Sequence, residues 1–402
     1  MVIECAVIGA GPAGLAASVS LSGFGIEHVV LERARPGETW RTQRWDSLHL
    51  NNPGFMNTML GEQDPDTYLT RLDVVQRLET LASKAPVITG TAVIGLSRLS
   101  GWWLLHTSDG PVEARTIVVA SGGENVPRVP ALASRLPDRI VQRHAATYRN
   151  PGALPDGGVL VVGSAQSGTQ ITQELLAAGR PVWLATSPVG RVWAEYRGRN
   201  ILRWLDEAGF FEDRPENLPD PRAILAVPAL LAPGGHSMSL QLLAQAGATL
   251  TGRLVAADGE ALAFDDSTAA NVAYGDGAAA TIRTRIDAHI RTHHIGAPAA
   301  GSEAAEQPIE GDPPRQLRLS SAGIASVVWC MGYTGSFRWL GDDLTDANGA
   351  PLRRGTASPA PGIWFIGLRW LVRRTSGNFI GFPKDADLIA DSVRAYLGAT
   401  SH

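Results

Sequence analysis

The chain has 402 residues, a length that predicts two or three domains at roughly 150 residues per domain. Hydrophobic residues make up 44% of the sequence and charged residues 18%, which is typical of a soluble globular protein. A net charge of −4 excludes a basic surface for nucleic acid or an anionic membrane, and since no run of about 18 apolar residues occurs, we expect no membrane span.

Cys5 and Cys330 are the only cysteines, and each lies in or beside an apolar run, so we expect both to be core thiols. No CxxC motif is present, which argues against disulfide-reductase chemistry. His293 and His294 have no Cys or carboxylate at ligand spacing, so we expect no metal site. The composition suits a reducing cytoplasm.

The first predicted unit lies in residues 3–33 and has the order strand, glycine turn, helix, strand, acid. Its parts are, in that order, residues 6–8, 9–14, 15–21 and 29–31, followed by Glu32. This is the order of a dinucleotide-binding βαβ unit. Gly9 permits the tight turn, Gly11 lets the backbone approach a pyrophosphate, and Gly14 lets the helix pack closely on the strand. The helix N-terminus favours phosphate, and Glu32 can accept hydrogen bonds from ribose hydroxyls, which predicts a cofactor with a free 2′-hydroxyl.

The connection that follows, residues 36–57, is rich in Gly, Arg and Trp and too polar for a core element. It is either a solvated loop with aromatic anchors or a loop that lies over a bound flavin and supplies polar contacts to it. Residues 68–83 have apolar positions at helical spacing, which predicts a helix. Residues 116–123 are an apolar run that ends on small residues, which predicts a buried strand whose end passes close to another group.

A second unit of the same order follows a proline-rich connection, and we place a domain boundary near Asn150. Its strand, glycine turn, helix and second strand are residues 159–162, 163–168, 169–178 and 182–185. Thr186 stands 23 residues after Gly163, as Glu32 stands 23 residues after Gly9. This internal repeat therefore has no acid where the first unit has one.

Basic residues follow the second unit instead, namely Arg191, Arg197 and Arg199. Guanidinium groups bind a 2′-phosphate through paired hydrogen bonds, whereas a carboxylate repels it. The alternative is that these arginines belong to a solvated face. The missing acid together with the three basic residues favours NADP in the second unit.

The closing part of the chain contains two further apolar runs, residues 326–333 and 362–367, and a helical pattern at 384–397. We assign these elements to the first domain. The predicted fold class is α/β, with two Rossmann-like dinucleotide-binding domains and the NADP domain inserted into the other. The predicted domains are residues 1–150 with 321–402, and residues 151–320.

Several motifs resemble those of the class B flavin-dependent monooxygenases, which include flavin monooxygenases, Baeyer–Villiger monooxygenases and microbial N-hydroxylases. They are GAGPAG at residues 9–14 with Glu32, GETWR…WDSL at 37–48, GSAQSG at 163–168, GRVWAEYRGRN at 190–200 and VVWCMGY at 327–333. The resemblance covers nearly the whole chain. It departs from the family's FxGxxxH linker signature, because His144 fits the histidine but Asp138 and Ile140 stand where Phe and Gly are usual.

The resemblance implies that the first domain binds FAD and the second binds NADP. It implies a single-component monooxygenase in which NADPH reduces FAD, dioxygen forms a flavin C4a-hydroperoxide, and this species oxygenates a small organic substrate. Asn51 and Asn52 are then candidate catalytic residues that hydrogen-bond the peroxide or the flavin, the alternative being that Asn-Asn-Pro-Gly is simply a turn. The implied cofactor-binding residues are Gly9, Gly11, Pro12, Ala13, Gly14, Glu32, Arg33, Trp40, Arg41, Trp45, Val93, Ser121, Gly122, Gly163, Ser164, Gln166, Ser167, Gly168, Thr186, Arg191, Arg197, Gly332 and Asn378.

The incomplete linker signature keeps a second enzyme class open, an NADPH oxidase or flavin reductase that makes hydrogen peroxide without oxygenating a substrate. The two intact fingerprints argue against a third hypothesis, a non-catalytic nucleotide-binding sensor. The expected partners are a small-molecule substrate and dioxygen, with no nucleic acid and no membrane. The substrate stays undetermined, and a homodimer stays open.

Overall fold

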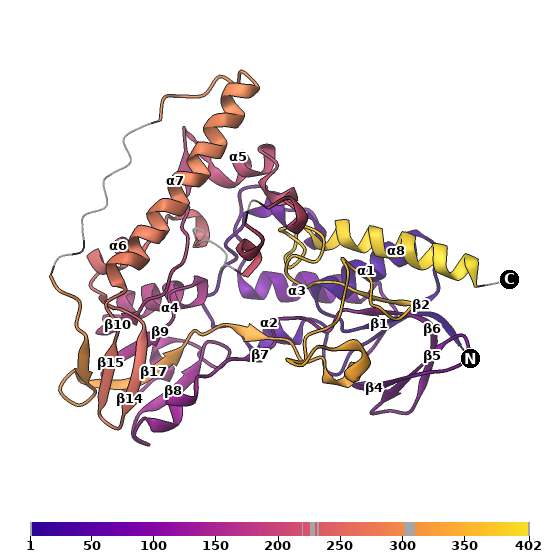
Figure 1. Cartoon of the computed structure of the whole chain (residues 1–402), viewed down its shortest axis with the longest axis horizontal. Helices are drawn as coiled ribbons and strands as arrows, with labels where there is room; N and C mark the ends of the chain where they lie inside the picture. The colour runs from indigo at the N-terminus through magenta and orange to yellow at the C-terminus, as the bar shows by residue number, and fades with distance from the viewer. Residues whose placement is uncertain are drawn as a thin grey trace.

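The computed structural model describes residues 2–218, 220–225, 230, 233–300, 309 and 311–400, and it consists of two lobes (Figure 1). One lobe holds both chain termini, and the other is made from the middle of the chain. Each lobe is built on a sheet with parallel central strands. Among the described residues, no helix is long and apolar enough to cross a membrane.

The first lobe contains a seven-stranded sheet in the order β3-β2-β1-β6-β5-β4, with β19 also paired to β6. Its strands are β1 (Ile3–Ile8), β2 (His28–Leu31), β3 (Val87–Ile88), β4 (Val93–Arg98), β5 (Trp103–Thr107), β6 (Val112–Val119) and β19 (Ile363–Phe365). The β4–β5 and β5–β6 pairs are antiparallel, and the pairs that join β3, β2, β1, β6 and β19 are parallel. The central strands are buried on both faces, which explains their continuous apolar runs.

Three helices cover one face of this sheet, namely α1 (Pro12–Gly23), α3 (Arg71–Ala82) and α8 (Phe382–Ala399). Helix α1 buries Leu15 and Leu21 completely and packs extensively on α8 as well as on the sheet. Helix α3 begins with a capping box, in which Thr70 and Asp73 each accept a hydrogen bond from the other's backbone N–H. The predicted helices at 15–21, 68–83 and 384–397 are confirmed.

The second lobe contains a five-stranded parallel sheet in the order β13-β10-β9-β17-β8. Its strands are β8 (Val141–His144), β9 (Gly158–Val162), β10 (Val182–Ala185), β13 (Thr249–Thr251) and β17 (Ile324–Trp329). Helices α4 (Gln166–Ala177) and α6 (Leu240–Gln245) pack on one face. A small antiparallel sheet covers the other face, made of β14 (Leu254–Asp258), β15 (Ala261–Phe264) and β16 (Gln316–Arg318).

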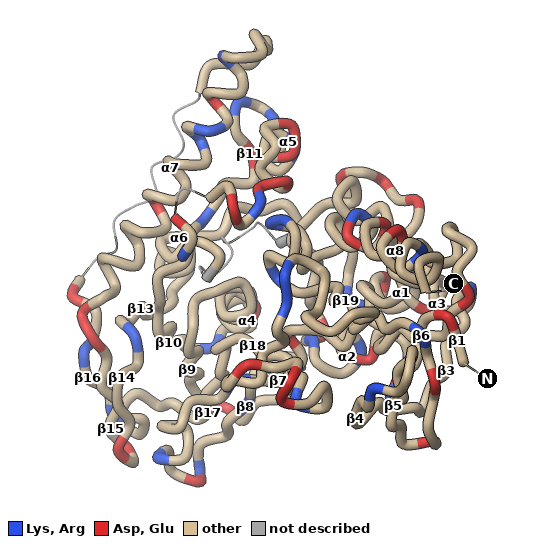
Figure 2. The backbone as a smooth tube through the Cα atoms, turned by 45° about the vertical axis from the view of Figure 1, so that its right-hand side comes forward, with Lys and Arg blue, Asp and Glu red and all other residues tan. Residues whose placement is uncertain are grey.

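An arm of this lobe carries α5 (Ile201–Glu207) and the long helix α7 (Thr268–Thr292), which runs along the outside of the lobe in Figure 1. Asp213, just beyond α5, accepts hydrogen bonds from Arg285 of α7 at 2.9 Å and from Arg374 of the closing segment at 2.8 Å. These ion pairs tie the arm to the first lobe. In the view of Figure 2, basic and acidic residues are interspersed over both lobes.

The chain crosses between the lobes at two places that lie side by side. Strand β7 (Val126–Pro127) on the outward crossing pairs antiparallel with β18 (Tyr333–Thr334) on the return. In addition, Arg128 N donates a hydrogen bond to Gly332 O at 3.1 Å. The two connections therefore form one short two-stranded ribbon.

The predicted domain boundaries at 150 and 321 are wrong for two strands. Both β8 and β17 belong to the second sheet, where β17 lies between β9 and β8. An apolar run shows that a strand is buried, but only pairing decides in which sheet it is buried. Strand β19 and helix α8 do return to the first lobe, and the predicted fold class, two Rossmann-like units with one inserted into the other, is confirmed.

Candidate cofactor and active site

A large cavity of about 1750 Å³ lies between the lobes and receives residues from both glycine turns. Single-ligand pockets are typically about 300–1,000 Å³, so this cavity has room for more than one ligand. The carboxyl ends of the central strands of both sheets open into it, which is where open α/β sheets bind ligands.

The first glycine turn is shaped by close backbone contacts. A Cβ on Gly9, whose φ is +106°, would lie 2.7 Å from Ala120 O, and a Cβ on Gly14 would lie 1.9 Å from Gly9 O. A Cβ on Gly11 would meet nothing within 4 Å. Gly11 therefore faces open space in the cavity, beside the N-terminus of α1, where backbone N–H groups favour an anion.

Glu32 closes the same turn. Its Oε2 accepts a hydrogen bond from Ala10 N at 2.7 Å, and its Oε1 accepts one from Ala34 N at 2.9 Å. The side chain is 9% exposed and lines the cavity. The carboxylate is thus fixed by the backbone at the edge of the cavity, while oxygen lone pairs stay available to a ligand hydroxyl.

The second glycine turn repeats this geometry around Cys330. A Cβ on Gly163, whose φ is +103°, would lie 2.5 Å from Cys330 O, and a Cβ on Gly168 would lie 1.8 Å from Gly163 O. Ala165 takes the place of Gly11 at the N-cap of α4, with extended backbone angles that any residue adopts. The close approach predicted for the end of β6 is therefore to the first glycine turn, and the end of β17 approaches the second turn in the same way.

The loop after α2 (Glu38–Thr42) reaches across the cavity to the second lobe. Asn51 Oδ1 accepts a hydrogen bond from Gln170 Nε2 of α4 at 2.8 Å. Asn52 Nδ2 donates to Asn57 Oδ1 at 2.6 Å, and Asn57 in turn donates to Pro53 O. The Asn-Asn-Pro-Gly segment is thus an ordered turn, and its Asn51 and Asn52 also line the cavity. Their catalytic role stays a prediction.

The predicted site residues all line this cavity except Gly14, Arg41, Ser164, Gly168, Arg191 and Arg197. The two glycines of this group pack beneath the turns, and Ser164 Oγ accepts a hydrogen bond from Ser187 N at 2.9 Å. Arg41 forms an ion pair with Glu79.

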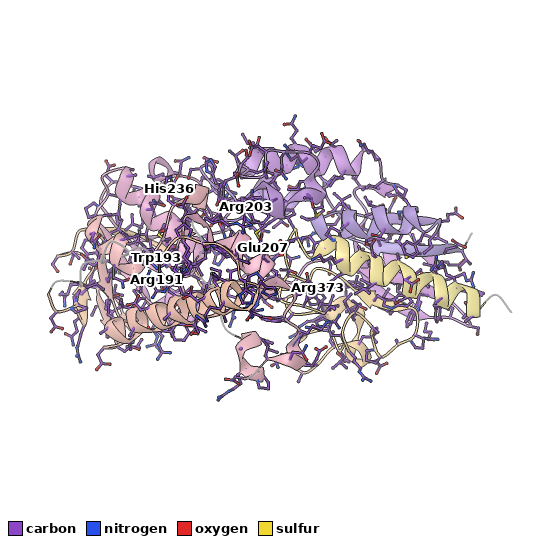
Figure 3. All side chains as sticks on the ribbon, turned by 90° about the horizontal axis from the view of Figure 1, so that it is seen from above. Arg191, Trp193, Arg203, Glu207, His236 and Arg373 are labelled. Atoms are coloured by element: carbon purple, nitrogen blue, oxygen red, sulfur yellow. The ribbon has the colours of Figure 1, made fainter. Side chains whose placement is uncertain are left out.

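The position of Arg191 and Arg197 corrects their predicted role in binding a 2′-phosphate. Arg191 lies 2.6 Å from Asp276 Oδ1 and stacks on Trp193, beside α7 (Figure 3), and Arg197 lies 2.8 Å from Asp287 Oδ1. Both aspartates belong to α7. The two arginines therefore anchor the long helix and stand outside the cavity.

Arg253 is a cavity residue that the sequence did not identify. Strand β13 pairs parallel with β10, with Thr251 opposite Ala185, so Arg253, two positions after Thr251, follows at the same sheet edge as Thr186 and Ser187. Both Arg253 and Thr186 line the cavity. The Arg253 side chain is 72% exposed and 3.4 Å from Asp265 Oδ2, which leaves most of its N–H groups to solvent or a ligand.

His144 and the two cysteines are buried in the protein. His144 Nε2 lies 3.1 Å from Gly332 O, and burial lowers the pKa of the imidazole. Burial raises the pKa of the Cys5 and Cys330 thiols to about 12, so neither is a ready thiolate. The two thiols lie in the cores of different lobes.

Residues 6–191 match the family model described as pyridine nucleotide-disulphide oxidoreductase. The matched segment contains both glycine turns, at residues 9–14 and 163–168. Cys5 and Cys330 are the chain's two cysteines, and they lie in different cores, so they form no dithiol pair.

Relatives and solved structures extend the likeness to the whole chain. An uncharacterized oxidoreductase CzcO-like of Geobacillus kaustophilus is 25% identical over 98% of both chains. The indole-3-pyruvate monooxygenase YUCCA1 of rice is 31% identical over 50% of this chain and 53% of its own. A flavin-containing monooxygenase from Stenotrophomonas maltophilia has the same fold, with a TM-score of 0.67 at 20% identity over 99% of this chain and all of its own. The predicted resemblance to flavin monooxygenases, and with it the expectation of an oxidoreductase, is confirmed.

Proposed function

We propose that this oxidoreductase is an NADPH-dependent FAD monooxygenase that oxygenates a small organic molecule. The observation that carries the proposal is one cavity receiving two glycine turns, of which only the first has an acid at the end of its second strand. Two nucleotides bound in this way share one cavity, which allows a hydride to pass directly from one to the other. An ornithine N-hydroxylase of Kutzneria, named as a complex with reduced FAD and NADP+, has the same fold at a TM-score of 0.64 and 15% identity.

The first turn fits FAD. Gly11 leaves open space at the N-terminus of α1, which suits the diphosphate, and the fixed carboxylate of Glu32 suits ribose hydroxyls. Asn378 and Trp40, which line the cavity beyond α1, are proposed to contact the flavin ring.

The second turn fits NADPH. Thr186 and Ser187 stand where an acid would repel a 2′-phosphate, and Arg253 supplies a guanidinium beside them. We therefore propose Arg253 in place of Arg191 and Arg197 as the arginine that favours NADPH over NADH.

When bound, the flavin supplies the redox and oxygen chemistry, and the protein supplies position and shielding. Asn51, fixed by Gln170, presents its amide at the junction of the two lobes. Asn52 is fixed by Asn57 in the same wall. We propose that these amides hold polar atoms at the reacting end of the cavity, while Met56 and Phe211 exclude water there.

The test begins with the purified protein, which should be yellow, release FAD on denaturation and oxidise NADPH. Reaction under labelled dioxygen in the presence of candidate nucleophilic substrates should place one labelled oxygen atom in the product. A protein that takes up no FAD would refute the proposal. Hydrogen peroxide equal to the NADPH consumed, with every substrate tried, would show instead the NADPH oxidase that the sequence left open.

A further inference from the structure

Arg374 of the closing segment lies in the cavity wall with its guanidinium against two aromatic rings. Its guanidinium carbon is 3.9 Å from the centroid of the Phe210 ring and 4.7 Å from that of the Trp370 ring. Nε donates a hydrogen bond to Phe210 O at 3.1 Å, and Nη2 donates one to Asp213 Oδ2 at 2.8 Å. A guanidinium has five N–H donors. The side chain is therefore held firmly by the protein and keeps further N–H donors for a ligand.

The carboxylate that faces Arg374 is shared with a second arginine. Asp213 accepts two hydrogen bonds from Arg285 of α7, at 2.9 Å and 3.0 Å, in addition to the one from Arg374. Two guanidinium groups thus have one carboxylate between them, which leaves a positive charge uncompensated. Burial lowers the pKa of Arg374, so its charge is poorly solvated. An anion in the cavity would restore the balance.

The ion pairs beside this one supply no spare carboxylate. Glu212 is paired with Arg373 at 2.7 Å and also with Lys384. Asp385 is paired with the same Arg373 at 3.2 Å, and burial raises the pKa of Asp385, which disfavours its charged form. None of these four side chains lines the described cavity, whereas Arg374 does. The surplus positive charge is therefore presented to the cavity by Arg374.

The three acids in the described part of the cavity wall are engaged at other places. Glu32 is fixed at the first glycine turn by backbone N–H groups. Glu38 is paired with Arg35 at 2.7 Å. Glu124 acts electrostatically on Arg44. The wall near Arg374 is thus left to attract an anion.

The wall next to Arg374 is apolar and leads to the amides at the junction of the lobes. Phe211, the neighbour of Phe210 in the chain, lines the cavity and packs in one core cluster with Met56, which lines the cavity too. Met56 precedes Asn57, the residue that fixes Asn52. An occupant of this region would contact a guanidinium at one end, apolar side chains in the middle and amides at the other end.

We propose that the substrate is a small organic carboxylate, with its carboxylate bound by Arg374 and its apolar body lying against Met56 and Phe211. A carboxylate fits the planar guanidinium fork through paired hydrogen bonds and supplies the missing negative charge. A neutral analogue would leave the poorly solvated charge unpaired, so the site should reject it. This assignment rests on the proposed function and narrows its substrate class.

The experiment is equilibrium dialysis of the purified enzyme against two probes of nearly equal shape, 3-(phenylthio)propanoate and its primary amide. The wild type should bind the acid about tenfold to a hundredfold more tightly, the range of a charge-assisted hydrogen bond. Arg374→Met keeps the length of the side chain and removes the charge. It should abolish this preference by weakening the acid, while the amide binds as before. Arg374→Lys keeps the charge without the planar fork and should retain part of the preference.

Arg285→Met is the matched control. Arg285 shares Asp213 with Arg374 and also stacks on Phe210, at 5.2 Å, but it stands outside the cavity. This variant loses an ion pair of the same cluster and should still prefer the acid. Equal loss of the preference in both variants would overturn the proposal, because it would show that the ion pairs hold the wall and not the substrate.

Two other results would also overturn the substrate assignment. One is a wild type that binds the acid and the amide alike, or an Arg374→Met protein that still prefers the acid. The other is loss of FAD or slower reduction by NADPH in Arg374→Met, which would place Arg374 at a cofactor. A wild type that takes up no FAD would refute the proposed function instead, and dialysis of that protein would still measure the preference for the acid.

Discussion

Gly14→Ala tests the packing that shapes the first nucleotide turn. The new Cβ would lie 1.9 Å from Gly9 O and 3.0 Å from Gly9 C, whereas real Cβ contacts essentially never fall below 3.0 Å. The helix and the turn would have to separate by about 1.1 Å to restore an allowed contact. Both contacting atoms belong to the backbone, so no side-chain rotation can relieve the clash.

Two effects of opposite sign decide the size of the change. Ala is favoured over Gly inside a helix by about 1 kcal/mol, whereas overpacking a tight contact costs about 1–3 kcal/mol. Because the contact is backbone on backbone, we take the upper end, which leaves a net destabilisation of about 2 kcal/mol. For a lobe of this size we expect the Tm to fall by about 4–8 °C.

Thermal unfolding of the ligand-free protein, followed by circular dichroism, measures this change. Gly11→Ala is the control, because its Cβ would meet nothing within 4 Å, and Ala165 already occupies the equivalent position of the second turn. Its Tm without ligand should match the wild type, so that any effect appears only in FAD affinity. A Gly14→Ala protein with the Tm of the wild type would refute the packing argument.

Three further outcomes test the site. Arg253→Ala should lower the ratio of kcat/KM for NADPH to that for NADH by about tenfold to a hundredfold. Arg191→Ala should keep this ratio and lower the Tm, because it removes the ion pair with Asp276 and the stacking on Trp193. The opposite pattern would restore the predicted role of Arg191. Asn51→Ala removes the hydrogen bond from Gln170 and should raise the fraction of NADPH that ends as hydrogen peroxide, measured by peroxidase assay; an unchanged fraction would exclude Asn51 from the reacting end. Burial lowers the pKa of His144 in the folded state, so below about pH 6.5 the unfolded state binds more protons and the free energy of unfolding should fall. His144→Gln should therefore make the Tm less dependent on pH in this range. The same pH dependence in the wild type and the variant would contradict the prediction.

The βαβ units could be predicted from sequence because their signals are local. Gly9, Gly14 and Glu32 act within a single strand–helix–strand passage, and the structure places them where the pattern requires. The same is true of Gly163 and Gly168.

What could not be predicted depends on pairing between distant segments. Arg191 and Arg197 follow Thr186 in sequence, but in the fold α7 lies against them and supplies the aspartates that hold them. Arg253 comes to the same sheet edge as Thr186 only because β13 pairs in parallel with β10. Thr186 donates a hydrogen bond to the carbonyl oxygen of Thr251, which lies 65 positions further along the chain. The contact between Asn51 and Gln170 and the placement of β17 are of the same long-range kind.

The crossing ribbon has a consequence for how the molecule is assembled. Arg128 enters the second lobe and Gly332 leaves it, and their backbone atoms are one hydrogen bond apart. A segment whose two ends meet in this way can be removed or exchanged without stretching its host, as successful domain insertions require. The second lobe is therefore a continuous insertion whose two ends meet, and a circular permutant opened within that lobe keeps both crossings in place.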